Sequence, residues 1–382
     1  MADEEKLQEL LSASRRENWA KPAQEWQQKG KKVIGIIDSY VPEEVLYAAG
    51  ILPIRIMHVS HKYITLAHAY RVVHTDAYYT NVLEALLKKE LPFIDGFVFT
   101  NRDDDSRRLC DVVDSVVKPP IAHLMHIPRT TTSPAVRRLG EEIVHLGEAL
   151  NKVWGLNVSD DALRQAAGVY NKNRELMGKL YELRKQDVPP LTGAEFLGLT
   201  TAAMVMPKDV FNQKLEPLMG YLEKRQAPIR HRRPRLIVSS DALDSREYIE
   251  LVETTGALVA MDDLDTGSRY FTLLTDTSAT DIKAALASRY LNRPGCPRMM
   301  SWDTQIALII QLIRDYRIDG FVELPLRNSF AREFRTPILM HALEEAQIPA
   351  ITLKREYEYT NEAQLATRIG GFIEMLGVSA SA

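Results

Sequence analysis

The sequence has few cysteines and no long apolar run, and each absence excludes a class of protein. Two cysteines, Cys110 and Cys296, occur in 382 residues, and their spacing matches no metal-binding or redox motif. No segment approaches the roughly 20 consecutive apolar residues that a membrane span requires. The acidic start, Met1–Glu5, lacks the apolar core of a secretory signal. We therefore expect a cytoplasmic chain with reduced thiols.

Strong charge of one sign and familiar catalytic motifs are also missing. The formal net charge is −3, so we expect neither nucleic acid nor an anionic membrane as a partner. The chain contains no Walker loop, no Gly-x-Ser-x-Gly or His-Glu-x-x-His motif, and no Gly-x-Gly-x-x-Gly after a strand. The common hydrolase and nucleotide-binding classes are therefore not indicated.

What the sequence does contain is a repeated pentapeptide, Ile-Asp-Gly-Phe-Val, at residues 94–98 and 318–322. Each copy follows an amphipathic helical stretch. Each precedes a polar loop, a helix-like segment and a short apolar run that begins at proline, Pro120 or Pro349. This order predicts two α/β domains folded alike, with a ligand cleft at the carboxyl ends of parallel strands. Chance is the alternative, because Asp-Gly is a common turn at strand entry.

The region between the two copies has a different pattern. After Ser133, apolar residues recur at helical spacing for about a hundred residues. The basic segment 225–235 is either a solvated linker or a contact for phosphates, and strand and helix patterns alternate again after it. We predict an α/β domain at residues 1–133, a helical region at 134–230 and a second α/β domain at 231–382.

Four polar loops directly follow predicted strands, at residues 38–43, 100–108, 262–269 and 326–329. The three aspartates of the second loop, beside paired arginines, could ligate a hard cation or arrange acid and base groups. They could equally cap a helix start, since acids are favoured there. The pair Asp262-Asp263 has the same two interpretations.

These loops resemble those of a known family. Ser39-Tyr40-Val41-Pro42-Glu43-Glu44 resembles the N-terminal signature of 2-hydroxyacyl-CoA dehydratase and benzoyl-CoA reductase subunits. Residues 101–108 resemble the family's Asn-Thr-Cys-Asp-x-x-Arg-Arg loop, and residues 262–269 resemble its Asp-Asp-x-Cys-Thr-Gly-x-Arg segment. Further matches at residues 319–327 and 368–374 extend the resemblance over nearly the whole chain.

The resemblance implies an α/β fold of two similar Rossmann-like parallel-sheet domains with a helical insert between them. It also implies a complex of two related subunits and a separate ATP-dependent iron–sulfur activator that supplies an electron. Typical subunits hold a [4Fe-4S] cluster through cysteines at the loop ends. The electron converts an acyl-CoA thioester into a ketyl radical, which permits loss of water or reduction of a ring.

The chain departs from the family at those cysteines. The expected positions carry Asp76 or a neighbour, Asp103, Asp265 and Ser329. Thiolates hold iron–sulfur clusters, and carboxylate or hydroxyl oxygens are poor substitutes. We therefore expect no metal and no cofactor bound by this chain, and a [4Fe-4S] cluster in a partner subunit.

Three functions remain open. In the first, a cluster-free subunit shapes an acyl-CoA pocket while a cluster-bearing paralogous subunit does the redox chemistry. The second is a non-radical acyl-CoA hydro-lyase that uses Asp103, Asp104 and Asp265, of which at least one needs a raised pKa. The third is a purely structural subunit. We predict catalytic positions at Ser39, Glu43, Asp103 and Asp104, and substrate-binding positions at Tyr40, Arg55, Arg107, Asp263, Arg269 and Ser329.

Overall fold

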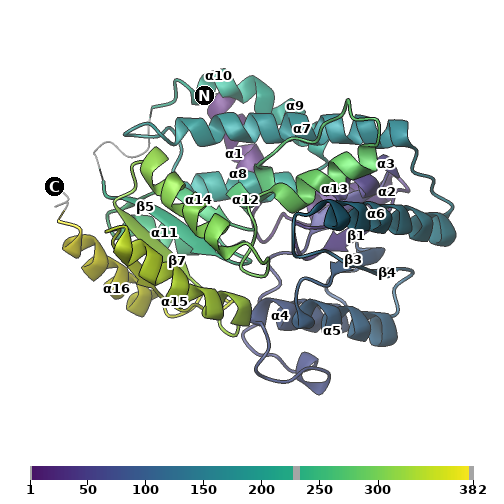
Figure 1. Ribbon diagram of the computed structural model, residues 1–382, viewed down its shortest axis with the longest axis horizontal. Helices are drawn as coiled ribbons and strands as arrows, with labels where there is room; N and C mark the ends of the chain where they lie inside the picture. Colours follow the sequence, from purple (N-terminus) through teal and green to yellow (C-terminus); the bar gives the residue numbers. More distant parts are fainter. Residues whose placement is uncertain (1, 227–232, 378–382) are drawn as a thin grey trace.

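The computed structural model describes residues 2–226 and 233–377 (Figure 1). These residues contain two four-stranded parallel sheets. The first sheet consists of β1 (Val33–Ile36), β2 (Leu52–Arg55), β3 (Gly96–Thr100) and β4 (Ala122–Met125). The second consists of β5 (Arg235–Ser240), β6 (Leu258–Leu264), β7 (Gly320–Leu324) and β8 (Ala350–Thr352). The strand orders, β2-β1-β3-β4 and β6-β5-β7-β8, are the same permutation, which confirms the predicted fold class.

The repeated pentapeptide has the same structural role in both sheets. The Asp95 carboxylate accepts the Val33 N–H at 2.9 Å, and the Asp319 carboxylate accepts the Arg235 N–H at 2.8 Å. Each aspartate therefore ties the start of β3 or β7 to the central strand beside it. The repeat is explained by strand pairing rather than by catalysis.

The glycine of each repeat is required by close packing. A Cβ at Gly96 would overlap the Ile121 side chain, and a Cβ at Gly320 would lie 2.9 Å from the Phe372 ring. Real Cβ atoms are not found at such distances, so a larger residue would push the covering element off the sheet.

The first domain contains five α-helices and a short 3-10 turn. They are α1 (Ala2–Ser12), α2 (Lys21–Gln28), α3 (Glu43–Ala48), η1 (Ala67–Ala69), α4 (Ala77–Leu87) and α5 (Asp104–Val112), and a π-helical turn at Val113–Val117 extends α5. The repeat pattern indicates a helix over residues 80–91, but α4 begins earlier. Asp76 caps it by accepting the Tyr78 N–H at 3.0 Å.

The helical region contains α6 (Ser133–Trp154), α7 (Asp160–Leu183), α8 (Gly193–Val205), α9 (Lys208–Leu215), η3 (Glu216–Leu218) and α10 (Met219–Leu222). A capping box between Thr192 and Glu195 begins α8. Nearly every residue of α8 is buried, because the helix packs against β2 of one sheet and β6 of the other. The helical region therefore fixes the two sheets relative to each other. Its predicted end at 230, and most of the basic segment, lie outside the described residues.

The second domain adds α11 (Glu247–Thr254), α12 (Ser268–Phe271), α13 (Ile282–Asn292), α14 (Trp302–Asp315), α15 (Phe330–Glu345) and α16 (Glu362–Met375). The part of the chain described here has no helix with both the length and the apolar character that a membrane crossing demands.

One strand is longer than the sequence predicts. We expected a polar loop at residues 262–269 directly after a strand, but β6 continues to Leu264, so Asp262 and Asp263 lie within the strand. The reason is their partner strand: Asp263 stands opposite Ser239, whose hydroxyl donates to the Asp263 carboxylate at 2.6 Å. The small polar side chain of Ser239 on β5 thus gives the buried Asp263 carboxylate a hydrogen-bond partner within the parallel sheet. The helix-start interpretation is wrong for Asp263, whereas the Asp262 carboxylate accepts the N–H of Ser268 at the start of α12 at 2.7 Å.

Candidate functional site

The carboxyl ends of the two sheets face each other across an inter-sheet seam. Arg55, the last residue of β2, pairs with Asp265 just after β6 at 2.7 Å. The backbone N–H of His58, beyond β2, donates to the Asp244 carboxylate beyond β5 at 2.8 Å. This edge is where ligands bind in parallel sheets. All four predicted polar loops reach this edge of their sheets.

The centre of the seam contains a buried ion network around Arg298, which lies between α13 and α14. Its guanidinium donates to Asp103, to Asp76 (3.3 Å), to Asp241 (3.4 Å) and to the Ser329 hydroxyl (3.4 Å). Ser329 in turn donates to Asp241 at 2.6 Å. We call these five residues the seam cluster. Three of the four positions where relatives are expected to carry cluster cysteines thus converge on one arginine.

The fourth position, Asp265, lies in an adjoining network. Its carboxylate accepts from Arg55 at 2.7 Å, from Arg102 at 3.4 Å and from the Ser39 hydroxyl at 2.5 Å. Arg293 donates to the same hydroxyl at 3.2 Å. Burial opposes ionisation of Asp265, but the surrounding arginines outweigh it and hold its pKa well below the usual range. Asp265 is therefore a fixed anion.

The three carboxylates proposed for a hydro-lyase do not converge in one pocket. Burial opposes ionisation of Asp103, but Arg298 and Arg102 more than compensate and lower its pKa. Asp104 projects into solvent, with its side chain 72% exposed. Burial, with Asp241 and Asp103 nearby, instead raises the pKa of Asp76 to about 7 despite Arg298, and burial also raises the pKa of Asp105. The three acids proposed for a hydro-lyase thus lack the arrangement which that chemistry needs.

Glu43 is buried beneath the helical region. Its carboxylate accepts from the hydroxyls of Tyr270 (2.7 Å) and Tyr170 (3.1 Å) and pairs with Lys208 at 3.3 Å. Only 2% of the residue is exposed. Its partners come from α7, α9 and α12, so Glu43 joins elements rather than facing an opening.

Glu44 has the same kind of surroundings. It pairs with Arg174 at 2.6 Å and accepts from the Tyr290 hydroxyl at 2.7 Å. Burial opposes ionisation, yet Arg174 and Arg289 lower the pKa of Glu44. We call Glu43, Glu44, Arg174 and Lys208 the turn cluster.

The remaining predicted positions are either paired or exposed. The Tyr40 hydroxyl accepts the Cys296 N–H at 3.0 Å, and Arg269 pairs with Asp263 at 2.9 Å. Arg107 is exposed on α5 and forms no salt bridge with a described residue. Of the positions predicted from the sequence, five lie along the seam: Ser39, Arg55, Asp103, Asp265 and Ser329. Glu43, Asp104 and Arg107 lie away from its centre.

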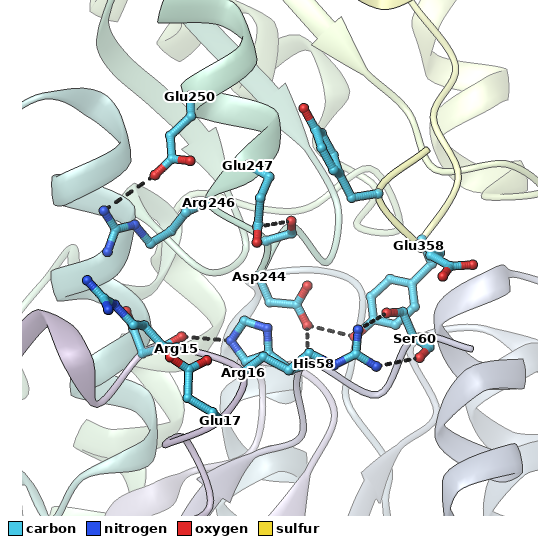
Figure 2. A pocket seen from close by; sticks show the side chains of 14 residues that line it. Arg15, Arg16, Glu17, His58, Ser60, Asp244, Arg246, Glu247, Glu250 and Glu358 are labelled. Carbon is cyan, nitrogen blue, oxygen red and sulfur yellow. Dashed lines mark hydrogen bonds and ion pairs between the residues drawn. The ribbon is translucent and has the colours of Figure 1, made fainter. Parts of the chain in front are cut away.

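Two cavities flank the seam. The larger, of about 420 Å³, lies at the carboxyl ends of β2, β5 and β8 (Figure 2). Its wall carries five acidic residues, Glu17, Asp244, Glu247, Glu250 and Glu358, and three arginines, Arg15, Arg16 and Arg246. Figure 2 shows that Arg16 reaches Ser60 and Arg246 reaches Glu250, so these arginines are engaged within the wall. Acidic side chains therefore predominate in this cavity.

The second cavity, of about 350 Å³, opens beside the seam cluster. Asp103, Arg298 and Arg102 contribute to its wall, together with Arg129 and Trp302. Asp104, Pro297, Met299, Met300 and Ala331 complete the lining. Predicted site residues thus meet open space here, in a wall that combines basic, apolar and aromatic surface.

The donors at the four expected cluster positions do not fit an iron–sulfur cluster. They are three carboxylates and one hydroxyl, and each already bonds to an arginine or to another seam residue. The two thiols are buried in different hydrophobic clusters, and burial raises the pKa of Cys110 to about 12. In residues 2–226 and 233–377, no three His, Cys, Asp or Glu side chains are grouped so as to hold a metal ion. Soft iron–sulfide chemistry needs thiolates that this seam does not supply.

Sequence reasoning missed Arg298 and Asp241. Asp241 follows β5 directly, at a position equivalent to the other polar loops, so its placement offered a signal. Arg298 follows a Cys-Pro pair in a connector and has no distinguishing pattern. The role of Arg298 becomes visible only in the folded chain, where it contacts Asp103 and Asp76, which lie 195 and 222 positions earlier.

Comparison with known proteins identifies the family. Residues 38–376 match the family described as 2-hydroxyglutaryl-CoA dehydratase, D-component. The beta subunit of (R)-phenyllactyl-CoA dehydratase from Clostridium sporogenes is 24% identical over 92% of this chain and 93% of its own. The beta subunit of (R)-2-hydroxyglutaryl-CoA dehydratase from Acidaminococcus fermentans is 23% identical over 91% and 93%. A subunit of benzoyl-CoA reductase from Thauera aromatica is 27% identical over 63% and 64%. The chain therefore belongs to the 2-hydroxyglutaryl-CoA dehydratase D-component family, whose members named here are subunits of acyl-CoA dehydratases and reductases.

Proposed function

We propose that this chain is a cluster-free subunit of a 2-hydroxyacyl-CoA dehydratase- or benzoyl-CoA reductase-like complex. It helps to bind an acyl-CoA thioester, while a homologous cluster-bearing subunit performs the radical dehydration or reduction. The observation that carries the proposal is the seam cluster. Where the family resemblance expects cysteine, this chain has oxygen donors that bond to Arg298, Arg55 and Arg102.

Charge balance supports the same conclusion. Arg298 compensates Asp76, Asp103 and Asp241 in a buried setting. A cluster in this space would displace the guanidinium and leave Asp76 and Asp103 without their ion-pair partner, which costs several kcal/mol. The present side chains therefore favour an ion network over a cluster.

The second cavity suits an acyl-CoA better than the larger one. Coenzyme A carries several phosphate charges, and acidic residues outnumber basic ones in the larger cavity. In the second cavity Arg129 is exposed and forms no salt bridge with any described residue. Trp302 and Met300 offer apolar surface beside it. We assign Arg129 to a phosphate of the ligand.

The relatives' names supply the argument for a partner. Each name designates one subunit of an enzyme, so those enzymes contain further chains. In the proposed complex the partner holds the [4Fe-4S] cluster and receives its electron from an ATP-dependent activator. This chain contributes binding surface and no redox group.

Measuring the amounts of iron and acid-labile sulfide per chain tests the cluster-free assignment. The protein is purified without oxygen and separated from any homologous subunit. We expect values near zero. About four irons per chain would contradict the proposal and require ligation by oxygen donors or by Cys110 and Cys296.

Direct binding tests the acyl-CoA assignment. Titration of the purified chain with benzoyl-CoA and with 2-hydroxyglutaryl-CoA is compared for wild type, Arg129→Glu and Arg15→Glu. We expect Arg129→Glu to weaken binding roughly tenfold or more, because it reverses a charge beside the phosphates. Arg15→Glu, in the larger cavity, is the matched control and should leave binding unchanged. If the wild-type chain binds neither acyl-CoA, the alternative of a purely structural subunit is favoured instead.

A further inference from the structure

A buried carboxylate on the wall of the larger cavity has no counter-charge. Asp244 lies beyond β5, and 5% of the residue is exposed. Its Oδ2 atom accepts the Tyr357 hydroxyl at 2.6 Å and the His58 N–H at 2.8 Å. Among residues 2–226 and 233–377, Asp244 has no salt-bridge partner, and no donor bonds its Oδ1 atom. Figure 2 shows this second oxygen free at the wall of the cavity.

Other buried carboxylates at this edge of the sheets are treated differently. Asp241 pairs with Arg332 at 3.0 Å, and Asp265 pairs with Arg55 at 2.7 Å. A carboxylate removed from water without a counter-charge is costly, so a buried one is normally paired. Asp244 instead has its unbonded oxygen at the wall of a cavity. We therefore expect the cation that balances Asp244 to come from a ligand in that cavity.

The rest of the wall adds to this negative charge. Three further carboxylates of the wall form no salt bridge with a described residue: Glu17, Glu247 and Glu358. Glu250, by contrast, is paired with Arg246. With His58 neutral, five carboxylates face three guanidinium groups across the whole wall, which leaves an excess of two negative charges. A ligand that carries two positive charges would balance the wall.

The geometry of the wall favours an extended organic cation. Within the described residues, no three His, Cys, Asp or Glu side chains are close enough together to share one metal ion. The free Oδ1 atom of Asp244 is an acceptor, and an ammonium group supplies N–H donors to such an oxygen. The rings of Tyr357 and Tyr359 belong to the same wall, and aromatic rings attract cations. A volume of about 420 Å³ is in the range of small-molecule sites.

We propose that the larger cavity binds a small aliphatic diamine in its diprotonated form. One ammonium group donates to the Oδ1 atom of Asp244, and the other lies among Glu17, Glu247 and Glu358. The chain that joins the two nitrogens passes the tyrosine rings of the wall. This assignment does not rest on the proposed function, because the larger cavity and the second cavity have no lining residue in common.

A diamine in this position would link the two α/β domains. The wall is built from the connector between α1 and α2, from the loop after β2, and from the loops after β5 and β8. The bond from the His58 N–H to Asp244 already joins the first domain to the second at this point. A ligand that binds the folded chain and not the unfolded one raises stability in proportion to its occupancy. The unfolding temperature should therefore rise with diamine concentration.

Isothermal titration calorimetry tests the class of ligand. The full-length chain, in a phosphate buffer free of other amines, is titrated with 1,4-diaminobutane, with 1-aminobutane and with 1,4-butanediol. We expect the diamine to bind at least about tenfold more tightly than the monoamine, because it satisfies a second carboxylate. The uncharged diol should not bind. Absence of diamine binding, or equal affinity for the diamine and the monoamine, would overturn the proposal.

Three variants test the location of the site. Asp244→Asn keeps an oxygen that can accept from Tyr357 and His58, and it should lower affinity for 1,4-diaminobutane at least about tenfold. Glu358→Gln, at a partly exposed position, should lower it about threefold and decides the matter if Asp244→Asn does not fold. Glu175→Gln, on the exposed side of α7, removes the same charge outside the cavity and should have no effect. Wild-type affinity in both cavity variants would show that the diamine binds elsewhere and would overturn the proposal.

Discussion

The turn cluster and the seam cluster are both buried ion networks, but they are organised differently. In the turn cluster, two carboxylates adjacent in sequence meet two cations, Arg174 and Lys208, and several tyrosine hydroxyls. In the seam cluster, one guanidinium serves three carboxylates from three separate loops. The first network has redundant donors. In the second, Arg332 also pairs with Asp241 at 3.0 Å, but Asp76 and Asp103 have Arg298 as their shared ion-pair partner, so loss of that one side chain should affect the network more.

Arg298→Met should therefore give the largest loss of stability. It removes the shared partner of Asp76, Asp103 and Asp241, and although Asp241 keeps Arg332, the other two carboxylates lose their ion pair. We expect the free energy of unfolding to fall by about 3–5 kcal/mol, measured by urea denaturation at pH 7.5. Arg327→Met, at an exposed arginine, is the control. A loss below about 1 kcal/mol for Arg298→Met would mean that Arg298 is not central to the seam.

The pH dependence of stability tests Asp76 in particular. Its pKa of about 7 in the folded protein lies above the value of about 4 expected in the unfolded chain, so the folded state binds the proton more tightly. The free energy of unfolding should fall as pH rises from about 4 to about 7, by the order of a few kcal/mol. Asp76→Asn, which still caps α4, should flatten this decline. Parallel profiles for the two proteins would show that Asp76 does not titrate in this range.

Glu44→Gln tests the turn cluster with a smaller expected effect. The amide retains the shape and accepts from Tyr290, but it loses the charge opposite Arg174. We expect a loss of about 2 kcal/mol, less than for Arg298→Met, because other donors and acceptors remain in the network. Differential scanning calorimetry on both variants makes the comparison. A larger loss for Glu44→Gln would reverse the order of dependence argued above.

Asp104→Ala should have the smallest effect. Its partner, Arg108, is one turn away, and both side chains are about 70% exposed. Exposed pairs of this kind contribute little, so stability should change by no more than about 0.5 kcal/mol. Complex activity should also persist if Asp104 has no chemical role. Loss of activity with unchanged stability would instead restore Asp104 as a functional acid.

The sequence predicted the parts of this structure that depend on local pattern. The repeated Asp-Gly and the order of helices and strands are set by neighbours along the chain, so they could be anticipated. The extension of β6 depended on the serine opposite Asp263, which only strand pairing reveals.

The site was predicted less completely, for a related physical reason. The polar loops were found because carboxyl ends of strands are recognisable from the sequence. Arg298 and Arg293, which bond Asp76 and Ser39 of the first domain, come from a connector in the second domain. A single sequence contains no signal for pairing over such distances. Glu43 and Asp265 therefore looked available for chemistry in the sequence, although both are fully paired in the structure.

The long-range character of the seam cluster has a kinetic consequence. Arg298 bonds residues that lie 222 and 195 positions earlier in the chain, so this network forms only after both sheets and α8 are in place. Loop closure over such distances is slow and late in folding. Interactions made after the transition state leave the folding rate unchanged and slow unfolding. The arginine between the two sheets would therefore set the lifetime of the assembled chain more than the speed at which it folds.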